Sequence, residues 1–215
     1  MAHLSRDPHL IEGFTHGEDV HRSTAARIFH IGPQEVTAEQ RRQAKVANFG
    51  IICGISPFGL SQRMGIPRGE AKLFIEEYFR SYPEVKDYID NSVASARERG
   101  YVETVFGRKR FLPDINSRNQ TVRGLAERNA VNAPVQGSAA DIIKLAMINV
   151  FRRFREEGLK SRMVLQVHDE LVFDVVAGER DKGMETVKRE MENVCSLLVP
   201  LTVECNYGKN WLEAH

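Results

Sequence analysis

The sequence lacks the features of secreted, membrane-spanning and zinc-binding proteins. Its 215 residues include only three cysteines, Cys53, Cys195 and Cys205. An odd number without C-x-x-C spacing argues against a disulfide scaffold or a zinc site. No apolar run approaches the roughly 20 residues that a membrane-spanning helix needs, and the polar start MAHLSRDPHL is unlike a signal peptide. We therefore expect a cytoplasmic protein without membrane contacts.

An excess of one charge is also lacking. The chain has 30 Lys and Arg against 29 Asp and Glu, which leaves a formal net charge of +1. The molecule is therefore no polycation, and any contact with nucleic acid has to come from a local patch. A hydrophobic content of 42% and a charged content of 27% are ordinary for a globular protein. The length allows one large domain or two small ones.

The pattern of elements predicts an α+β fold, in which helices come first and an antiparallel sheet with helices on it follows. A capping box from Thr37 to Gln40 opens one helix, and Pro134 should break a later one. Helices are expected near 37–53, 68–80, 83–99, 119–131, 138–158 (with Ser138 as its N-cap) and 180–198. Strands are expected near 101–105, 110–112, 163–167, 171–176 and 201–204, and those at 163–167 and 171–176 look buried.

The run RRQAKVANFGIIC places Arg41, Lys45, Phe49 and Cys53 four residues apart, which is one face of a helix. Arg41 and Phe49 are then roughly 12 Å apart, a span comparable to that from the triphosphate to the base of a nucleotide. The cations can bind phosphate oxygens, and the ring can pack on sugar and base. The alternative is a surface helix with two solvated charges and one buried Phe.

His168-Asp169-Glu170 lies between the two expected apolar strands. A tight hairpin turn favours Gly or Asn, yet this turn is charged and has neither. Two carboxylates held by strands suit Mg²⁺, which takes oxygen ligands from one or two carboxylates and from substrate phosphates. The alternative is an exposed polar turn.

Arg128, Asn132 and Gln136 follow a basic stretch at four-residue steps. The first two share a helical face, and Gln136 comes just past Pro134. Amides of Asn and Gln can donate to the minor-groove acceptors that every base pair presents. The alternative is ordinary solvation of a helix and a turn. Of the seven histidines, His21 and His168 are the two near charged candidates.

Three motifs in this order resemble family A DNA polymerases. RRQAKVANFGIICG is similar to the helix motif of the fingers subdomain, and VNAPVQGSAADIIKLAM and LQVHDELVF are similar to two motifs of the palm. The resemblance implies template-directed DNA synthesis from dNTPs on primer–template DNA, with two Mg²⁺ ions, in the bacterial cytoplasm near the nucleoid. It implies a palm remnant at 1–20, a fingers subdomain at 21–125 and a palm subdomain at 126–215. A single-subunit RNA polymerase fits less well, because the HDE and NFG runs look like those of the DNA enzymes.

The resemblance also implies a role for each matching residue. Phe49, where some relatives have Tyr, implies discrimination against dideoxynucleotides. Nucleotide binding falls to His21, Arg41, Lys45, Phe49 and Cys53. DNA binding falls to Arg128, Asn132, Gln136 and His168. Catalysis falls to Asp169, Glu170 and Lys45, and metal binding to Asp169 and Glu170.

Two departures from the family pattern qualify these expectations. Cys53 replaces a Tyr beside the template base, so we expect altered mismatch discrimination, which Cys53→Tyr in an active longer form should change. The motif Asp-Tyr-Ser-x-Ile-Glu-Leu-Arg, with a second essential Asp, is absent before Met1. The chain is therefore interpreted as a C-terminal fragment that lacks the N-terminal part of the polymerase and is inactive alone. The alternative is a non-catalytic fragment that binds dNTP or DNA and self-associates through its palm surface.

Overall fold

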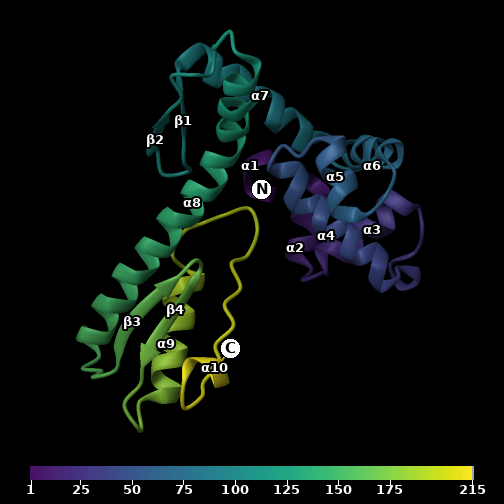
Figure 1. Ribbon diagram of the computed structural model, residues 1–215. Helices are drawn as coiled ribbons and strands as arrows, with labels where there is room; N and C mark the ends of the chain where they lie inside the picture. The colour runs from purple at the N-terminus through teal and green to yellow at the C-terminus, as the bar shows by residue number, and fades with distance from the viewer. Residues whose placement is uncertain (215) are drawn as a thin grey trace. The chain divides into compact units, whose positions relative to one another are not determined.

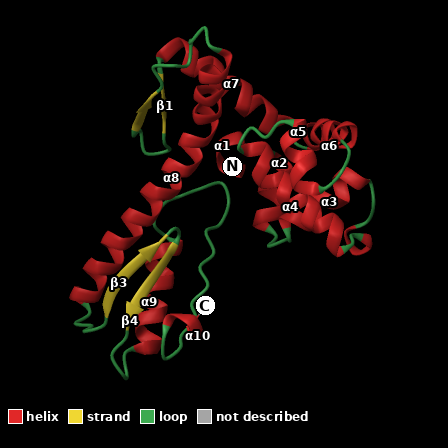
Figure 2. Cartoon of the chain, viewed as in Figure 1, coloured by secondary structure: helices red, strands yellow, loops and turns green. Residues whose placement is uncertain are grey.

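The computed structural model describes residues 1–214. The chain divides into two compact units, one from Met1 to Gln136 and one from Gly137 onward. Helices make up most of the first unit and nearly half of the second, and the described residues of each unit include one two-stranded antiparallel sheet (Figures 1 and 2). The α+β expectation is confirmed. No helix among the described residues is both long enough and apolar enough to cross a membrane.

The first unit consists of short helices followed by a small hairpin. The N-cap of its fourth α-helix is the predicted capping box, in which Thr37 Oγ1 accepts the Gln40 N–H at 3.2 Å and Gln40 Oε1 accepts the Thr37 N–H at 2.9 Å. The elements are α1 (Ala2–Ser5), α2 (Pro8–Thr15), α3 (Val20–Phe29), the 3-10 helix η1 (Pro33–Glu35), α4 (Ala38–Ile52), α5 (Pro57–Met64), α6 (Arg68–Ser81), α7 (Pro83–Arg99), β1 (Tyr101–Glu103), β2 (Lys109–Phe111) and the first part of α8 (Gln120–Glu156).

Helices α3 and α4 pack through small side chains. Ala25 and Ala26 of α3 meet Ala44 of α4 and Val36 in a buried cluster. Alanines let two helix backbones approach closely, and close approach brings polar side chains near the start of α3 within hydrogen-bonding range of α4. The positions of the functional residues described below depend on this contact.

A second cluster joins the end of α7 to the hairpin and to α8. The predicted hairpin is confirmed, with Tyr101 paired with Phe111 and Glu103 with Lys109. Gly100 ends α7 in the left-handed region, at φ 75°. The buried side chains of this cluster are Ala96, Val102, Leu112, Ile115, Ala126 and Ala130.

The predicted break at Pro134 is wrong, because α8 runs unbroken from Gln120 to Glu156 with Pro134 inside it. Proline removes one backbone donor and normally kinks or breaks a helix. Here the helix is packed on both sides of the proline, through Ala130 in the cluster above and Val150 further along. Ser138, the predicted N-cap of a new helix, is instead a buried residue within α8.

The second unit contains the rest of α8, β3 (Arg162–Val167), β4 (Glu170–Asp174), α9 (Arg180–Glu192) and α10 (Trp211–Ala214). One buried cluster in it consists of Val150, Phe154 and Val187, and Ile143 and Ala146 of α8 are buried as well. Both predicted strands are confirmed as an antiparallel pair, but they are not buried, since Val164 is 59% exposed.

The last predictions for the second unit are wrong. Helix α9 ends at Glu192 rather than at 198. Asn193 follows it as the C-cap, and its side-chain amide donates to the Arg189 carbonyl at 2.8 Å. The segment 201–204 forms no strand. Its Val203 N–H donates to Glu192 Oε1 at 3.0 Å, so a side chain takes the place of a strand partner.

Candidate functional site

One face of α4 carries the predicted nucleotide-binding residues. Lys45, Phe49 and Cys53 are exposed and Arg41 is partly exposed, with Cys53 as the C-cap of the helix. Phe49 is 60% exposed, so the alternative of a surface helix with one buried Phe is wrong for this ring. A large aromatic side chain in solvent on a basic helix face is available to a ligand.

Asp19 connects this face to α3. Its Oδ1 accepts the backbone N–H groups of His21 and Arg22, both at 3.1 Å, and so caps the helix. Its Oδ2 accepts Arg41 Nε at 2.6 Å. Burial opposes ionisation of Asp19, but the hydrogen bonds from Arg41 and the backbone outweigh it and lower the pKa of this carboxyl. The carboxylate therefore fixes both the start of α3 and the guanidinium of Arg41.

His21 lies beside the same face of α4. Its Nδ1 is 3.0 Å from Asn48 Nδ2, and its ring centroid is 5.8 Å from that of Phe49, with the planes tilted by 50°. Burial lowers the pKa of His21, Asp19 opposes this effect, and the charges of Arg41 and Lys45 lower the pKa further. The structure therefore brings His21, Arg41, Lys45 and Phe49 together, with a histidine that favours its neutral form.

Sequence reasoning missed the residues that hold this arrangement. Asn48, Thr24 and Tyr82 form a hydrogen-bonded chain beneath His21, and all three are buried. Two signals were available in the sequence. Asp19 directly precedes a helix, where Asp is a preferred N-cap, and Asn48 stands among small residues at a position where a polar side chain needs a partner.

The end of α4 meets α8 at Gly54. This glycine has φ 70°, and a Cβ built on it would lie 2.9 Å from Arg128 Cγ. The aliphatic part of Arg128 therefore packs on the Gly54 backbone, directly after Cys53. Because α8 is continuous, Arg128, Asn132 and Gln136 share one helix face, including the glutamine that the sequence placed beyond a break.

The predicted carboxylates lie in the second unit, at the β3–β4 turn. Val167 pairs with Glu170, which leaves His168 and Asp169 as a two-residue turn. His168 adopts φ 53°, which is uncommon for a residue other than glycine, and its carbonyl accepts Gln166 Nε2 at 2.6 Å. Asp169 is exposed, while Glu170 begins β4 and its Oε1 accepts Trp211 Nε1 at 3.0 Å.

The donor chemistry of the turn fits Mg²⁺ only in part. Carboxylate oxygens are suitable ligands, and Mg²⁺ commonly takes its others from water and substrate phosphates. Within residues 1–214, however, no group of three or more His, Cys, Asp or Glu side chains is arranged to hold a metal ion. Asp169 and Glu170 therefore offer at most part of a metal site.

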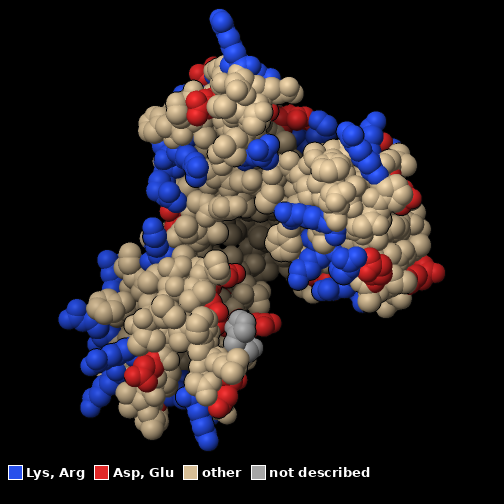
Figure 3. Space-filling view, viewed as in Figure 1, with Lys and Arg blue, Asp and Glu red and all other residues tan. Residues whose placement is uncertain are grey.

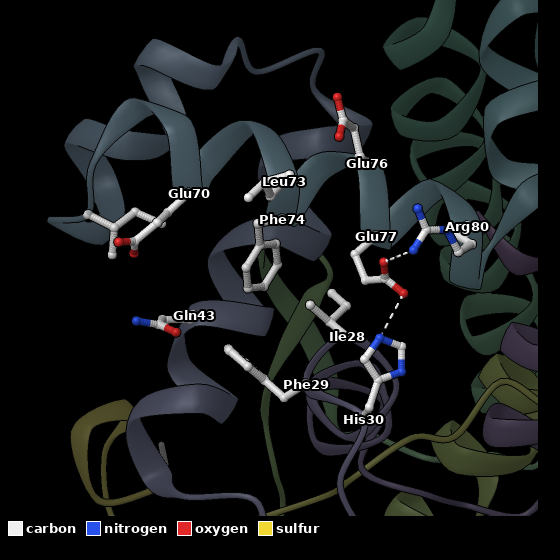
Figure 4. A pocket seen from close by; sticks show the side chains of 11 residues that line it. Ile28, Phe29, His30, Gln43, Glu70, Leu73, Phe74, Glu76, Glu77 and Arg80 are labelled. Carbon is white, nitrogen blue, oxygen red and sulfur yellow. Dashed lines mark hydrogen bonds and ion pairs between the residues drawn. The ribbon is translucent and has the colours of Figure 1, made fainter.

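Other charged side chains and a cavity lie away from the predicted site residues. On the face drawn in Figure 3, basic side chains form several separate groups with acidic ones among them. A cavity of about 410 Å³ lies between α3, α4 and α6. At its rim, Glu77 Oε1 lies 3.1 Å from His30 Nε2, and Glu77 also pairs with Arg80 (Figure 4). None of the predicted site residues lines this cavity; its lining is Ile28, Phe29, His30, Gln43, Ile66, Glu70, Leu73, Phe74, Glu76, Glu77 and Arg80.

Comparison with known proteins gives matches that cover nearly the whole of this chain. The model of DNA polymerase family A matches residues 1–213. DNA polymerase I of Lactococcus lactis subsp. cremoris (strain MG1363) is 52% identical over 215 residues, which are 100% of this chain and 24% of that protein. DNA polymerase I of Caldicellulosiruptor bescii is 52% identical over 213 residues, 99% of this chain and 25% of that protein. The chain thus spans about a quarter of the length of these curated relatives.

A solved structure gives the same result for the fold. It is described as the POL domain of Pol1 from M. smegmatis in complex with DNA primer-template and dNTP. The match has a TM-score of 0.95 at 49% identity, over 99% of this chain and 38% of that chain. Since the family model covers almost every residue and the relatives share about half of them, this chain belongs to DNA polymerase family A.

Proposed function

We propose that this chain supplies the nucleotide-binding helix and metal-binding carboxylates of a DNA-directed DNA polymerase, which adds dNTPs to a primer 3′ end by two-metal phosphoryl transfer. One observation carries the proposal: Arg41, Lys45 and Phe49 share an exposed face of α4 with His21 beside it. The solved relative, a POL domain in complex with DNA primer-template and dNTP, supports the same ligands for this chain.

Each residue of the α4 face has a proposed task. Arg41 and Lys45 bind triphosphate oxygens by charge-assisted hydrogen bonds, and Lys45 also stabilises the charge that develops on the phosphates. Phe49 packs on the incoming sugar and base. Cys53, at the end of the helix, takes the place beside the template base.

The remaining tasks fall to α8 and to the β3–β4 turn. Arg128, Asn132 and Gln136 contact the primer–template duplex, and so does His168. Asp169 and Glu170 hold Mg²⁺, which when bound lowers the cost of charge on the transferring phosphate. We assign residues 1–20 and 126–215 to the palm and 21–125 to the fingers, and keep the bacterial cytoplasm as the proposed location.

Titration of the purified chain with a Mg²⁺–dNTP complex tests the nucleotide site. We expect Lys45→Ala to weaken binding roughly 10- to 100-fold, because a hydrogen bond to a charged group contributes about 1.5–3 kcal/mol. The matched control is Arg42→Ala on the same helix, since Arg42 is bound to Glu39 at its guanidinium and should not reach the ligand. Equal effects of the two substitutions would contradict the proposal.

A second candidate is that the polypeptide alone binds dNTP or DNA without catalysis. The absence of a three-residue metal cluster within 1–214 favours it. Primer extension by the purified chain and by Asp169→Asn separates the two candidates. Extension that Asp169→Asn abolishes means that another carboxylate completes the site, and no extension from either leaves binding as the activity.

The same candidate includes self-association. Val164 and Leu165 of β3 are 59% and 46% exposed, and among the described residues β3 pairs only with β4. An exposed apolar strand edge is a template for pairing with another chain. Light scattering of the purified chain should show a concentration-dependent dimer that Val164→Lys disrupts, and a monomer at all concentrations would remove this part of the proposal.

A further inference from the structure

The hydrogen bonds beneath His21 determine which of its ring nitrogens carries the proton. His21 Nδ1 is 3.0 Å from Asn48 Nδ2, and the same amide nitrogen is 3.1 Å from Thr24 Oγ1. Thr24 Oγ1 is also 2.7 Å from the Val20 carbonyl and 3.0 Å from the Tyr82 hydroxyl. These contacts form one chain of donors and acceptors from the buried tyrosine to the imidazole.

The single hydroxyl proton of Thr24 sets the direction of this chain. The Val20 carbonyl can only accept, so the short 2.7 Å contact takes the Thr24 proton. Thr24 Oγ1 is then an acceptor toward its other neighbours. The Tyr82 hydroxyl therefore donates to it at 3.0 Å, and the Asn48 amide donates to it at 3.1 Å.

The orientation of the Asn48 amide follows. The amide oxygen of Asn48 is 3.3 Å from the same Thr24 Oγ1, so the amide nitrogen makes the shorter of the two contacts. With the two ends exchanged, the oxygen would come to 3.1 Å from a Thr24 oxygen whose proton is used in the bond to Val20, and two acceptors would face each other at the shorter distance. The shorter contact favours the amide nitrogen at this position, and its second proton then points to His21 Nδ1. A nitrogen that accepts a hydrogen bond is unprotonated, so in the neutral ring the proton is on Nε2.

We infer that Asn48 is a positioning residue that holds His21 as the Nε2–H tautomer, so that the histidine donates a hydrogen bond from Nε2 to a phosphate oxygen of the nucleotide. The phosphate part of this inference rests on the proposed function, while the tautomer rests on the contacts alone. Thr24 and Tyr82 act only through Asn48. They are 0% and 1% exposed, which anchors the amide in the core of the first unit.

The surrounding charges are consistent with a neutral donor. Asp19 at the start of α3 and Arg41 and Lys45 on α4 are the charged groups that act on His21. Burial and the two cations lower the pKa of His21 in spite of Asp19. A neutral Nε2–H can donate to phosphate without adding a third positive charge beside the two cations, which would repel it.

Long-range ¹H–¹⁵N correlation spectroscopy of the ¹⁵N-histidine-labelled chain, at a pH where His21 is neutral, reads the tautomer directly. His21→Gln identifies the resonances of His21 among the seven histidines. We expect the Nε2–H pattern in the unaltered chain. In Asn48→Asp a carboxylate can only accept, so the proton should move to Nδ1 and the pKa of His21 should rise.

Asn91→Asp serves as the matched control, because it adds the same charge on an exposed position of α7 and should leave the tautomer unchanged. An Nδ1–H pattern in the unaltered chain overturns the inference, even if Asn48→Asp fails to fold. A pattern that does not change in folded Asn48→Asp overturns the role of Asn48.

Titration with a Mg²⁺–dNTP complex separates this inference from the proposed function. A shift of the His21 Nε2 resonance that is lost in Asn48→Asp supports the donor role. An Nε2–H pattern that dNTP leaves unchanged, while Lys45→Ala still weakens binding, overturns the donor role but not the nucleotide site. An unchanged pattern together with no dNTP binding at all contradicts the proposed function and leaves the tautomer assigned.

Discussion

The two units hold their candidate residues in different ways. In the first unit, Arg41 and His21 are bound to partners whose own hydrogen bonds continue to a helix cap or into the core. In the second unit, Asp169 stands at the tip of a two-residue turn between β3, which is mostly exposed, and β4, which is mostly half-buried. The exposed face of α4 is therefore organised by contacts within the first unit, whereas the carboxylates of the second unit depend on a small sheet.

The buried cores of the two units also differ, and the first unit again has more buried contacts. The first unit has separate buried clusters around α3–α4 and around α7, the hairpin and α8. In the described part of the second unit, the cluster beneath the sheet is centred on Val150, Phe154 and Val187. A two-stranded sheet is marginal without such packing, so the hairpin that carries Asp169 should depend on very few side chains.

Phe154→Ala should cause the largest loss of stability, and the loss should be confined to the second unit. Phe154 is 6% exposed, and its ring centroid lies 5.6 Å from that of Phe173 on β4. Truncating a buried Phe typically costs about 3–5 kcal/mol. Amide hydrogen exchange should therefore show lost protection in β3, β4 and α9, while α3 and α4 keep theirs.

Phe151→Ala is the control, because Phe151 is 58% exposed on the same helix and should change stability by no more than about 0.5 kcal/mol. A uniform loss of protection across both units after Phe154→Ala would mean that they unfold together, and the comparison would fail.

Gly54→Ala should cause an intermediate loss of stability, because it disturbs the contact between the end of α4 and α8. A left-handed φ costs an alanine roughly 1–2 kcal/mol, and the new Cβ would also lie 2.9 Å from Arg128 Cγ. Gly65 has a similar φ of 68°, and a Cβ built on it would have no atom within 4 Å. Gly65→Ala therefore measures the backbone strain alone. In thermal unfolding, Gly54→Ala should have a lower Tm than Gly65→Ala. An equal loss of Tm in both variants would show that Arg128 moves aside freely.

Asp7→Asn should have the smallest effect, and it depends on pH. Asp7 caps α2 through Oδ1, while its Oδ2 and Glu84 Oε2 are buried without a hydrogen-bond partner. Burial raises the pKa of Asp7, the backbone N–H of Leu10 opposes this, and Glu84 raises it further. The native state therefore binds this proton more tightly than the unfolded chain does. The resulting stability is complete below the unfolded pKa and is lost as pH rises through the folded one.

Asn caps a helix as well as Asp does, so Asp7→Asn should raise the free energy of unfolding at neutral pH by about 1 kcal/mol and give no gain at low pH. Urea unfolding at several pH values measures the difference. The exposed Asp87→Asn on α7 is the control and should show no such pH dependence. A decrease in the free energy of unfolding of Asp7→Asn at neutral pH would mean that the charged carboxylate stabilises the first unit.

Local sequence signals predicted most elements but not their continuity. The Thr37 capping box, the Gly100 helix end and the 101–112 hairpin depend on neighbours in sequence, and all are present. The break at Pro134 was predicted from local backbone chemistry and was overridden by packing on both sides of the proline. The prediction that the 163–167 strand is buried is wrong, because apolar composition does not show what covers a strand.

The sequence by itself determined the α+β class, the family and the spacing of Arg41, Lys45 and Phe49, because helical periodicity and motif order are properties of the chain alone. Only the tertiary structure decided that Asp19 binds Arg41, that Asn48 faces His21 and that Gly54 receives the Arg128 side chain. The partners in these three pairs are 22, 27 and 74 residues apart in sequence, respectively. No local pattern specifies such contacts, since they depend on which helix faces pack together.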